Sequence, residues 1–277
     1  MRGNRVYVRT QKSNSYRHPV NEDSYMFSEY AFMQDEKIRV LVIADGMGGL
    51  SDGEKASHNA VLGFCKAFYA SMAETYMKVS MELFSMSYFA DKMEGIVKEA
   101  IREANSAVCR NTAPYIASGT TLSVVCLVGG YGIVANVGDS PVFFYRAKTR
   151  ELKLVSKLQT IAEMEVAAGK YERYSQEYYA NDHYLYNSLG EHLTLDDMDI
   201  ACNQIGKLSE GDVFLIGSDG AFGRLEEYEL LELLESCEVE DESFFLSQLF
   251  ELARADKDDD QTAILYVVCE EETNGEY

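Results

Sequence analysis

Five consecutive apolar residues, Val40 to Ala44, lead directly into Asp45, and this feature constrains the fold more than any other. A strand without alternation of polar and apolar residues is expected to be covered on both of its faces. We therefore predict a buried strand over residues 38–44 that ends in a carboxylate and a turn, Asp45-Gly46.

Two helices are predicted from apolar residues that recur at three- and four-residue spacing. The first follows Ser51, whose side chain can cap the first turn while Glu54 reaches back to it. The second extends from Met93 to Val108. Residues 71–90, which are rich in Met and Tyr, are interpreted as helix extension and packing.

From Gly119 onward the pattern is typical of strands, followed by two short helices that carry Leu230 and Leu246. Strands are predicted at residues 24–27, 120–128, 132–137, 142–145, 152–155, 199–204, 213–217 and 262–268. Residues 156–190 have no clear period and are interpreted as a flap-like excursion. The order of elements predicts a single α+β domain over residues 1–270, with helices layered on sheets, and an acidic tail at 271–277.

The chain is strongly acidic, with 46 acidic and 25 basic residues and a formal net charge of −21. Such a surface repels nucleic-acid phosphates and anionic lipid, so we expect neither nucleic acid nor membrane as a partner. The six cysteines form no Cys-x-x-Cys pair and only four histidines are available, which argues against a zinc cluster or a disulfide framework. Without a signal-peptide pattern, a cytoplasmic location is expected.

Four aspartates lie at the ends of predicted strands: Asp45, Asp139, Asp219 and Asp260. An aspartate beside a glycine often reflects only turn chemistry, and the run 258–260 is typical of a solvated loop. Several buried strands that each bring a carboxylate to one end of a sheet nevertheless crowd negative charge, which is unfavourable unless cations neutralise it.

Mg²⁺ and Mn²⁺ are hard divalent ions that take oxygen ligands and leave room for water. The absence of a side chain at Gly46 would allow a backbone carbonyl to approach the same ion as Asp45. The residues therefore favour a two-metal site that activates water and holds a phosphoryl group.

Seven segments extend, in order, over nearly the whole chain: Asn21–Ser24, Val42–Gly49, Ser118–Thr121, Asn136–Ser140, Ser188–Gly190, Gly211–Gly220 and Asp260–Thr262. Each alone is a weak signal, but the seven in this order are highly specific. Together they resemble the metal-dependent Ser/Thr protein phosphatase family (PPM, the type 2C phosphatases), in its bacterial-type branch. The resemblance implies two packed antiparallel β-sheets flanked by helices on both sides, with the metals in a cleft at one end.

The resemblance also implies roles for individual residues. Asp45 would bridge two Mn²⁺ or Mg²⁺ ions, with the carbonyl of Gly46 and the carboxylates of Asp219 and Asp260 as further ligands. Glu22 and Asp23 would act through metal-bound waters. Asp139 together with Asp219 would be able to hold a third, weaker ion.

The chain departs from the family pattern at several positions. Met47 stands where eukaryotic members have a histidine that is proposed as the general acid, and methionine cannot donate a proton. Pro141 and Gln261 replace the usual arginine and asparagine, and the usual Asp-His pair is absent from residues 156–160. The phosphate-binding arginine is expected to be Arg17, one position off the family spacing, although a solvated loop position is its alternative.

The leading hypothesis is an active, monomeric phosphatase of phosphoserine and phosphothreonine in proteins that a Ser/Thr kinase has phosphorylated. One alternative is a pseudophosphatase that uses the same fold as a binding or regulatory module. The other is a phosphatase of a small phosphorylated metabolite, which a deep pocket rather than an open cleft would favour.

Overall fold

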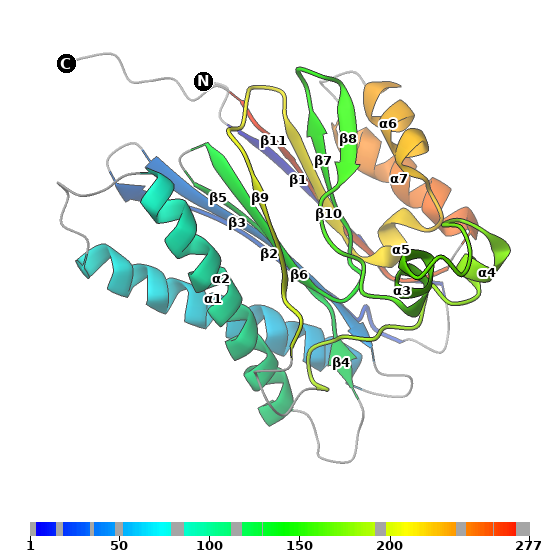
Figure 1. The fold of residues 1–277 in the computed structure, drawn as a ribbon, viewed down its shortest axis with the longest axis horizontal. Helices are drawn as coiled ribbons and strands as arrows, with labels where there is room; N and C mark the ends of the chain where they lie inside the picture. Colours follow the sequence, from blue (N-terminus) through cyan, green and yellow to red (C-terminus); the bar gives the residue numbers. More distant parts are fainter. Residues whose placement is uncertain are drawn as a thin grey trace.

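Two antiparallel β-sheets lie face to face, and helices cover the outer face of each (Figure 1). This computed structural model describes residues 4–14, 19–33, 36–47, 52–78, 86–111, 118–128, 130–191, 198–236, 242–256 and 258–269. The arrangement is the α+β fold of two packed antiparallel sheets with helices on both sides that the sequence predicts.

The first sheet has the strand order β2-β3-β5-β6-β9, and the short strand β4 pairs with β3 beside it. Its strands are β2 (Asp23–Met33), β3 (Glu36–Met47), β4 (Gly119–Thr120), β5 (Leu122–Val128), β6 (Tyr131–Val137) and β9 (Ala201–Ile205). The second sheet has the order β1-β11-β10-β7-β8. Its strands are β1 (Arg5–Gln11), β7 (Val142–Arg146), β8 (Glu151–Leu154), β10 (Val213–Gly217) and β11 (Gln261–Val267).

The helices form the two outer layers and one group at an end of the molecule (Figure 1). The first sheet is covered by α1 (Gly53–Lys78) and α2 (Met86–Asn111), and the second by α6 (Glu227–Ser236) and α7 (Glu242–Asp256). The short helices α3 (Ile161–Ala167), α4 (Gln176–Tyr179) and α5 (Asp219–Phe222) lie together at one end. Within the described residues, no helix has the length and apolar character of a membrane span.

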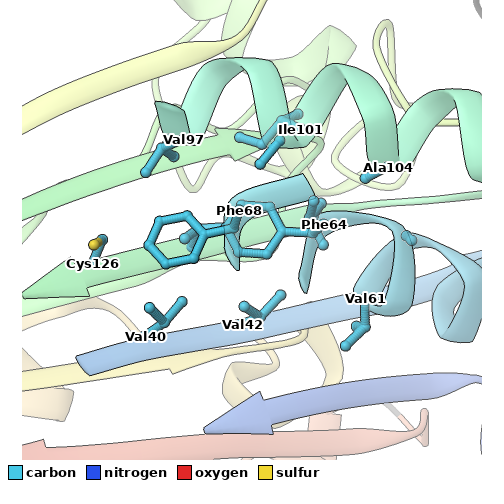
Figure 2. Close-up of a cluster of buried hydrophobic side chains, with 14 of the residues drawn as sticks. Val40, Val42, Val61, Phe64, Phe68, Val97, Ile101, Ala104 and Cys126 are labelled. Carbon is cyan, nitrogen blue, oxygen red and sulfur yellow. The ribbon is translucent and has the colours of Figure 1, made fainter. Parts of the chain in front are cut away.

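Strand β3 shows why the layers stack in this order. Leu41 and Ile43 point into the core between the two sheets, whereas Val40 and Val42 point into the core beneath α1 and α2. Figure 2 shows these two valines facing Phe68 and its neighbours on the helices. Both faces of the strand are buried, which confirms the prediction from its unbroken apolar run.

Most predicted elements are present, and the differences have physical causes. The cap expected at Ser51 lies outside the described residues. The segment 156–190, for which no period was found, contains α3 and α4, which begin at the side-chain caps Thr160 and Ser175. Helices of seven and four residues are too short to show a periodic pattern.

Replacing Phe68 with alanine should destabilise the fold strongly. The Phe68 side chain is fully buried against the first sheet, and its removal leaves a cavity that costs about 3–5 kcal/mol. Leu62→Ala on the same helix is the control, because Leu62 is 53% exposed and its truncation should change stability by no more than about 0.5 kcal/mol. Denaturant unfolding followed by circular dichroism measures both; equal losses would contradict the assignment of this core.

Candidate functional site

The predicted carboxylates come from strand ends that meet at one end of the two sheets. Asp23 and Asp45 are directly opposite each other in the register of β2 and β3. Asp219 is the first residue of α5, immediately after β10 and Ser218, and Asp260 immediately precedes β11. Both sheets therefore contribute aspartates to the same end of the molecule.

Asp260 connects the start of the chain to this end. Its Oδ1 accepts a hydrogen bond from the backbone N–H of Ser13 at 2.7 Å, and its Oδ2 accepts one from the N–H of Glu22, also at 2.7 Å. A carboxylate oxygen has two lone pairs, so each oxygen retains acceptor capacity for a cation. The two bonds hold the segments that follow β1 and precede β2 against the second sheet.

Asp23 carries a buried oxygen without a partner. Its Oδ2 accepts a hydrogen bond from the Ser218 hydroxyl at 2.8 Å, whereas Oδ1 is buried and has no hydrogen-bond partner among the described residues. Burial, together with the charges of Asp260 and Asp219, raises the pKa of Asp23 to about 7 against the opposing hydrogen bonds. A buried acceptor left unpaired is costly, and a cation would satisfy it.

Asp45 lies among the other carboxylates. Burial, followed by the charge of Asp23, raises its pKa well above the ordinary value, and further contributions come from Asp219, Asp259 and Asp139. Its backbone is fixed, because its N–H donates to the Thr121 hydroxyl at 3.0 Å and its carbonyl accepts from the Thr120 hydroxyl at 2.8 Å. The protein thus holds Asp45 where like charges accumulate.

Two glycines permit close backbone approach at this site. A Cβ on Gly46 would lie 2.2 Å from the carbonyl oxygen of Gly53, and a Cβ on Gly220 would lie 2.1 Å from that of Asp260. Neither glycine has a positive φ. The predicted turn at Asp45-Gly46 is therefore wrong: β3 continues through Met47 and pairs with β4, and glycine is needed there for space.

Glu22 faces the start of α1. A Cβ on Gly53, the first residue of that helix, would lie 2.6 Å from Glu22 Oε1, and the Glu22 carbonyl accepts a hydrogen bond from Gly46 at 3.2 Å. The positive end of the helix dipole favours a carboxylate in this position.

A layer of buried polar side chains behind the carboxylates was missed in the sequence. The Thr121 hydroxyl, which holds Asp45, is 2.6 Å from the hydroxyl of Ser140, the residue after Asp139. The side-chain oxygen of Gln159 accepts a hydrogen bond from Gly138 N–H at 2.7 Å, on the other side of Asp139. One sign of this layer is present in the sequence: residues 156–160, which include Gln159, lack the Asp-His pair of the family pattern.

The donor set suits hard divalent cations. The structure brings together the five predicted aspartates, Asp23, Asp45, Asp139, Asp219 and Asp260, and adds Asp259, which sequence reasoning assigned to a solvated loop. Among the described residues, no group of three or more aspartate, glutamate, histidine or cysteine side chains is placed so that it could hold a metal ion by itself. Mg²⁺ normally keeps several waters and takes only one or two carboxylates, so crowded aspartates with an unpaired oxygen fit it. Arg17 lies outside the described residues.

A cavity of about 460 Å³ adjoins these carboxylates. Asp139 and Asp219 form part of its wall, and the remaining wall comes from the segment 156–190, strands β7 and β8, and residues 222–227. We call this cavity the side pocket.

Comparisons with known proteins agree with the fold. The family model described as "Protein phosphatase 2C" matches residues 10–261. The protein phosphatase PhpP of Streptococcus pneumoniae is 25% identical over 197 residues, which are 71% of this chain and 73% of PhpP. The Mycobacterium tuberculosis serine/threonine phosphatase PstP superimposes with a TM-score of 0.71 at 22% identity, covering 96% of this chain and 99% of PstP. A structure of the PstP catalytic domain with two manganese ions gives a TM-score of 0.67 at 23% identity, with 96% and 99% covered.

Metal-free protein should lose stability as the pH rises from about 4 to about 7. The pKa of Asp23 is 3.8 ordinarily and about 7 in the fold, so in this window the folded state keeps a proton that the unfolded state releases. In Asp23→Asn the side chain at position 23 cannot titrate, so stability should fall less steeply with pH. Glu99→Gln is the control, because the Glu99 side chain is 56% exposed and its replacement should leave the slope unchanged. Urea unfolding in chelator at several pH values measures this; an unchanged slope in Asp23→Asn would contradict it.

Proposed function

The chain belongs to the protein phosphatase 2C family, and from this we propose that it hydrolyses phosphoserine and phosphothreonine in proteins at a site holding two Mn²⁺ or Mg²⁺ ions. The observation that carries the proposal is the group of partly buried aspartates at the sheet ends, in which Asp23 keeps an unpaired oxygen and Asp45 has a raised pKa. Such a group is stable at neutral pH when cations are bound.

The bound metals would supply a nucleophile from water near neutral pH and neutralise charge on the phosphoryl oxygens. Asp45 would bridge them, with the carbonyl of Gly46 and the carboxylates of Asp219 and Asp260 as further ligands. Glu22 and Asp23 would act through water, and Asp139 with Asp219 would hold a third ion.

The chain's own contacts would position these ligands. The bonds from Thr120 and Thr121 fix the backbone of Asp45, and the Ser218 hydroxyl orients Asp23. The two backbone bonds to Asp260 leave its carboxylate one orientation. Met47, at the end of β3, has no proton to give, so the departing serine or threonine oxygen takes its proton from water or another group.

We further propose that the substrates are products of a Ser/Thr kinase and that the protein acts as a monomer in the cytoplasm. The five described cysteines are free thiols, which supports a reducing compartment, and the net charge of −21 argues against nucleic acid as a partner. Hydrolysis of phosphopeptides distinguishes this function from a pseudophosphatase, which would hydrolyse nothing, and from a metabolite phosphatase, which would prefer small substrates.

Chelation of divalent metal should abolish phosphopeptide hydrolysis, and Mn²⁺ or Mg²⁺ should restore it. Asp45→Asn and Asp219→Asn should each lower kcat by more than about 100-fold, since mutating even the outer partners of metal ligands typically costs about 10–100-fold. Asp199→Asn is the matched control, because that carboxylate only pairs with Lys157 at the surface and is 50% exposed. Steady-state kinetics with purified protein decide; full activity in chelator would overturn the proposal.

Arg17→Ala should raise KM for a phosphopeptide and leave metal affinity nearly unchanged, because a guanidinium can bind phosphoryl oxygens in bidentate fashion without touching the ions. The other candidate, Arg9, donates to Ser247 of α7 at 3.0 Å and lies over the Phe250 ring, so it is engaged elsewhere. Arg102→Ala, on the surface of α2, is the control. Kinetics and Mn²⁺ titration of the three proteins are compared; parent-like kinetics in Arg17→Ala would return Arg17 to a solvated loop position.

A further inference from the structure

The side pocket opens beside the candidate metal ligands and is lined mainly by apolar and aromatic side chains. Asp139 and Asp219 form part of its wall, and Phe143, Leu154 and Phe222 also line it. Cavities of roughly 300–1,000 Å³ with such a lining are typical of ligand sites, in which a few polar groups set orientation. A substrate whose phosphate lies at Asp219 would have its neighbouring residues at the entrance of this cavity.

Three tyrosines form an aromatic wall on one side of the pocket. The ring of Tyr178 lies edge-on to those of Tyr174 and Tyr179, with centroids 5.8 Å and 5.7 Å apart. The guanidinium of Arg224, another lining residue, lies 4.6 Å from the centre of the Tyr179 ring. These contacts hold the wall in place before any ligand arrives.

The hydroxyl of Tyr178, the central tyrosine of this wall, is hydrogen-bonded to the protein itself. The Tyr178 hydroxyl donates to Glu163 at 2.7 Å, and the other oxygen of Glu163 pairs with Arg173 at 2.5 Å. Tyr174 has a φ of 65°, a left-handed conformation that a bulky residue rarely adopts. This backbone conformation accompanies the placement of its aromatic ring on the pocket wall.

The charges around the pocket are of both signs and partly pair with one another. Arg173 is paired with Glu163, and His183 lies 3.5 Å from Asp182. A carboxylate or an ammonium group entering the pocket would therefore meet like charges as well as opposite ones. An uncharged apolar group would instead cover the aromatic and aliphatic lining.

We propose that the side pocket binds an aromatic or large aliphatic side chain of the substrate, close in sequence to its phosphorylated residue. The inference rests on the proposed phosphatase function and adds a preference to it. Tyr174, Tyr178 and Tyr179 determine this preference, and Arg224 keeps Tyr179 in place through the contact of its guanidinium with the ring.

The test uses a set of phosphothreonine peptides in which one position at a time carries Ala, Phe, Glu or Lys. The varied position is each of the three residues before and the three residues after the phosphothreonine. At one position Phe should raise kcat/KM about tenfold or more over Ala, the usual scale of discrimination by an apolar pocket, and Glu and Lys should not. Tyr179→Ala should reduce the Phe-to-Ala ratio to near one. Arg224→Ala, at an exposed residue whose loss leaves the fold intact, should lower it as well.

Tyr131→Ala is the matched control, because Tyr131 is an exposed tyrosine at the opposite end of β6 from Asp139. It should keep the parent ratio, and thermal unfolding checks that every variant is folded. A small aryl phosphate carries no neighbouring residue, so its hydrolysis reports the phosphatase function separately from the preference among peptides.

Each outcome decides between the two proposals. Hydrolysis of the aryl phosphate with equal kcat/KM for all peptides overturns the side-pocket proposal and leaves the phosphatase function standing. A preference for Glu or Lys overturns the assigned class of side chain, and an unchanged ratio in both Tyr179→Ala and Arg224→Ala overturns the assigned wall. Failure to hydrolyse either kind of substrate overturns the phosphatase function and the side-pocket proposal together.

Discussion

The crowding of buried carboxylates where the two sheets end is the constraint on which the rest of the structure depends. Asp23 and Asp45 face each other across two paired strands, and the charges of Asp219 and Asp260 act on them from the other sheet. Without counter-ions this arrangement opposes folding, because burial and like charge both disfavour the ionised carboxylates. Large apolar cores on both faces of each sheet offset that cost.

Backbone hydrogen bonds make the carboxylate group a structural junction as well as a candidate site. Asp260 holds the segments on either side of residues 15–18, and Ser218 links Asp23 of the first sheet to Thr262 of the second, since its hydroxyl donates to one and accepts from the other. In Asp260→Asn the amide nitrogen cannot accept a hydrogen bond, so one of the two bonds from the backbone N–H groups of Ser13 and Glu22 would be lost. Substitutions there consequently affect folding and cation binding together, whereas Asp45, whose backbone bonds do not involve its carboxylate, separates the two effects.

The sequence was sufficient to predict the main strands and both long helices, because their apolar patterns persist over many residues. The unbroken run before Asp45 correctly indicated a strand buried on both faces. Short elements such as α5, with four residues, carry too little pattern to be recognised. The steric need for glycine at position 46 could not be predicted from the sequence, because the carbonyl of Gly53 that would clash with a side chain there belongs to a separate element. Asp259 was assigned to a solvated loop because only the fold brings its charge near Asp45.

The turn that carries Asp139 connects the carboxylate group to the wall of the side pocket. On one side Ser140 contacts Thr121, which holds Asp45, and on the other side Gly138 is bonded to Gln159. Gln159 also accepts from Asn187, so it joins both ends of the segment that supplies the tyrosine wall. The backbone N–H of Gln159 donates to the carbonyl of Gly138 at 3.1 Å as well, so both the backbone and the side chain of Gln159 hold this turn. Because a buried amide left without its partners is costly, Gln159 fixes the turn of Asp139 and the tyrosine segment against each other.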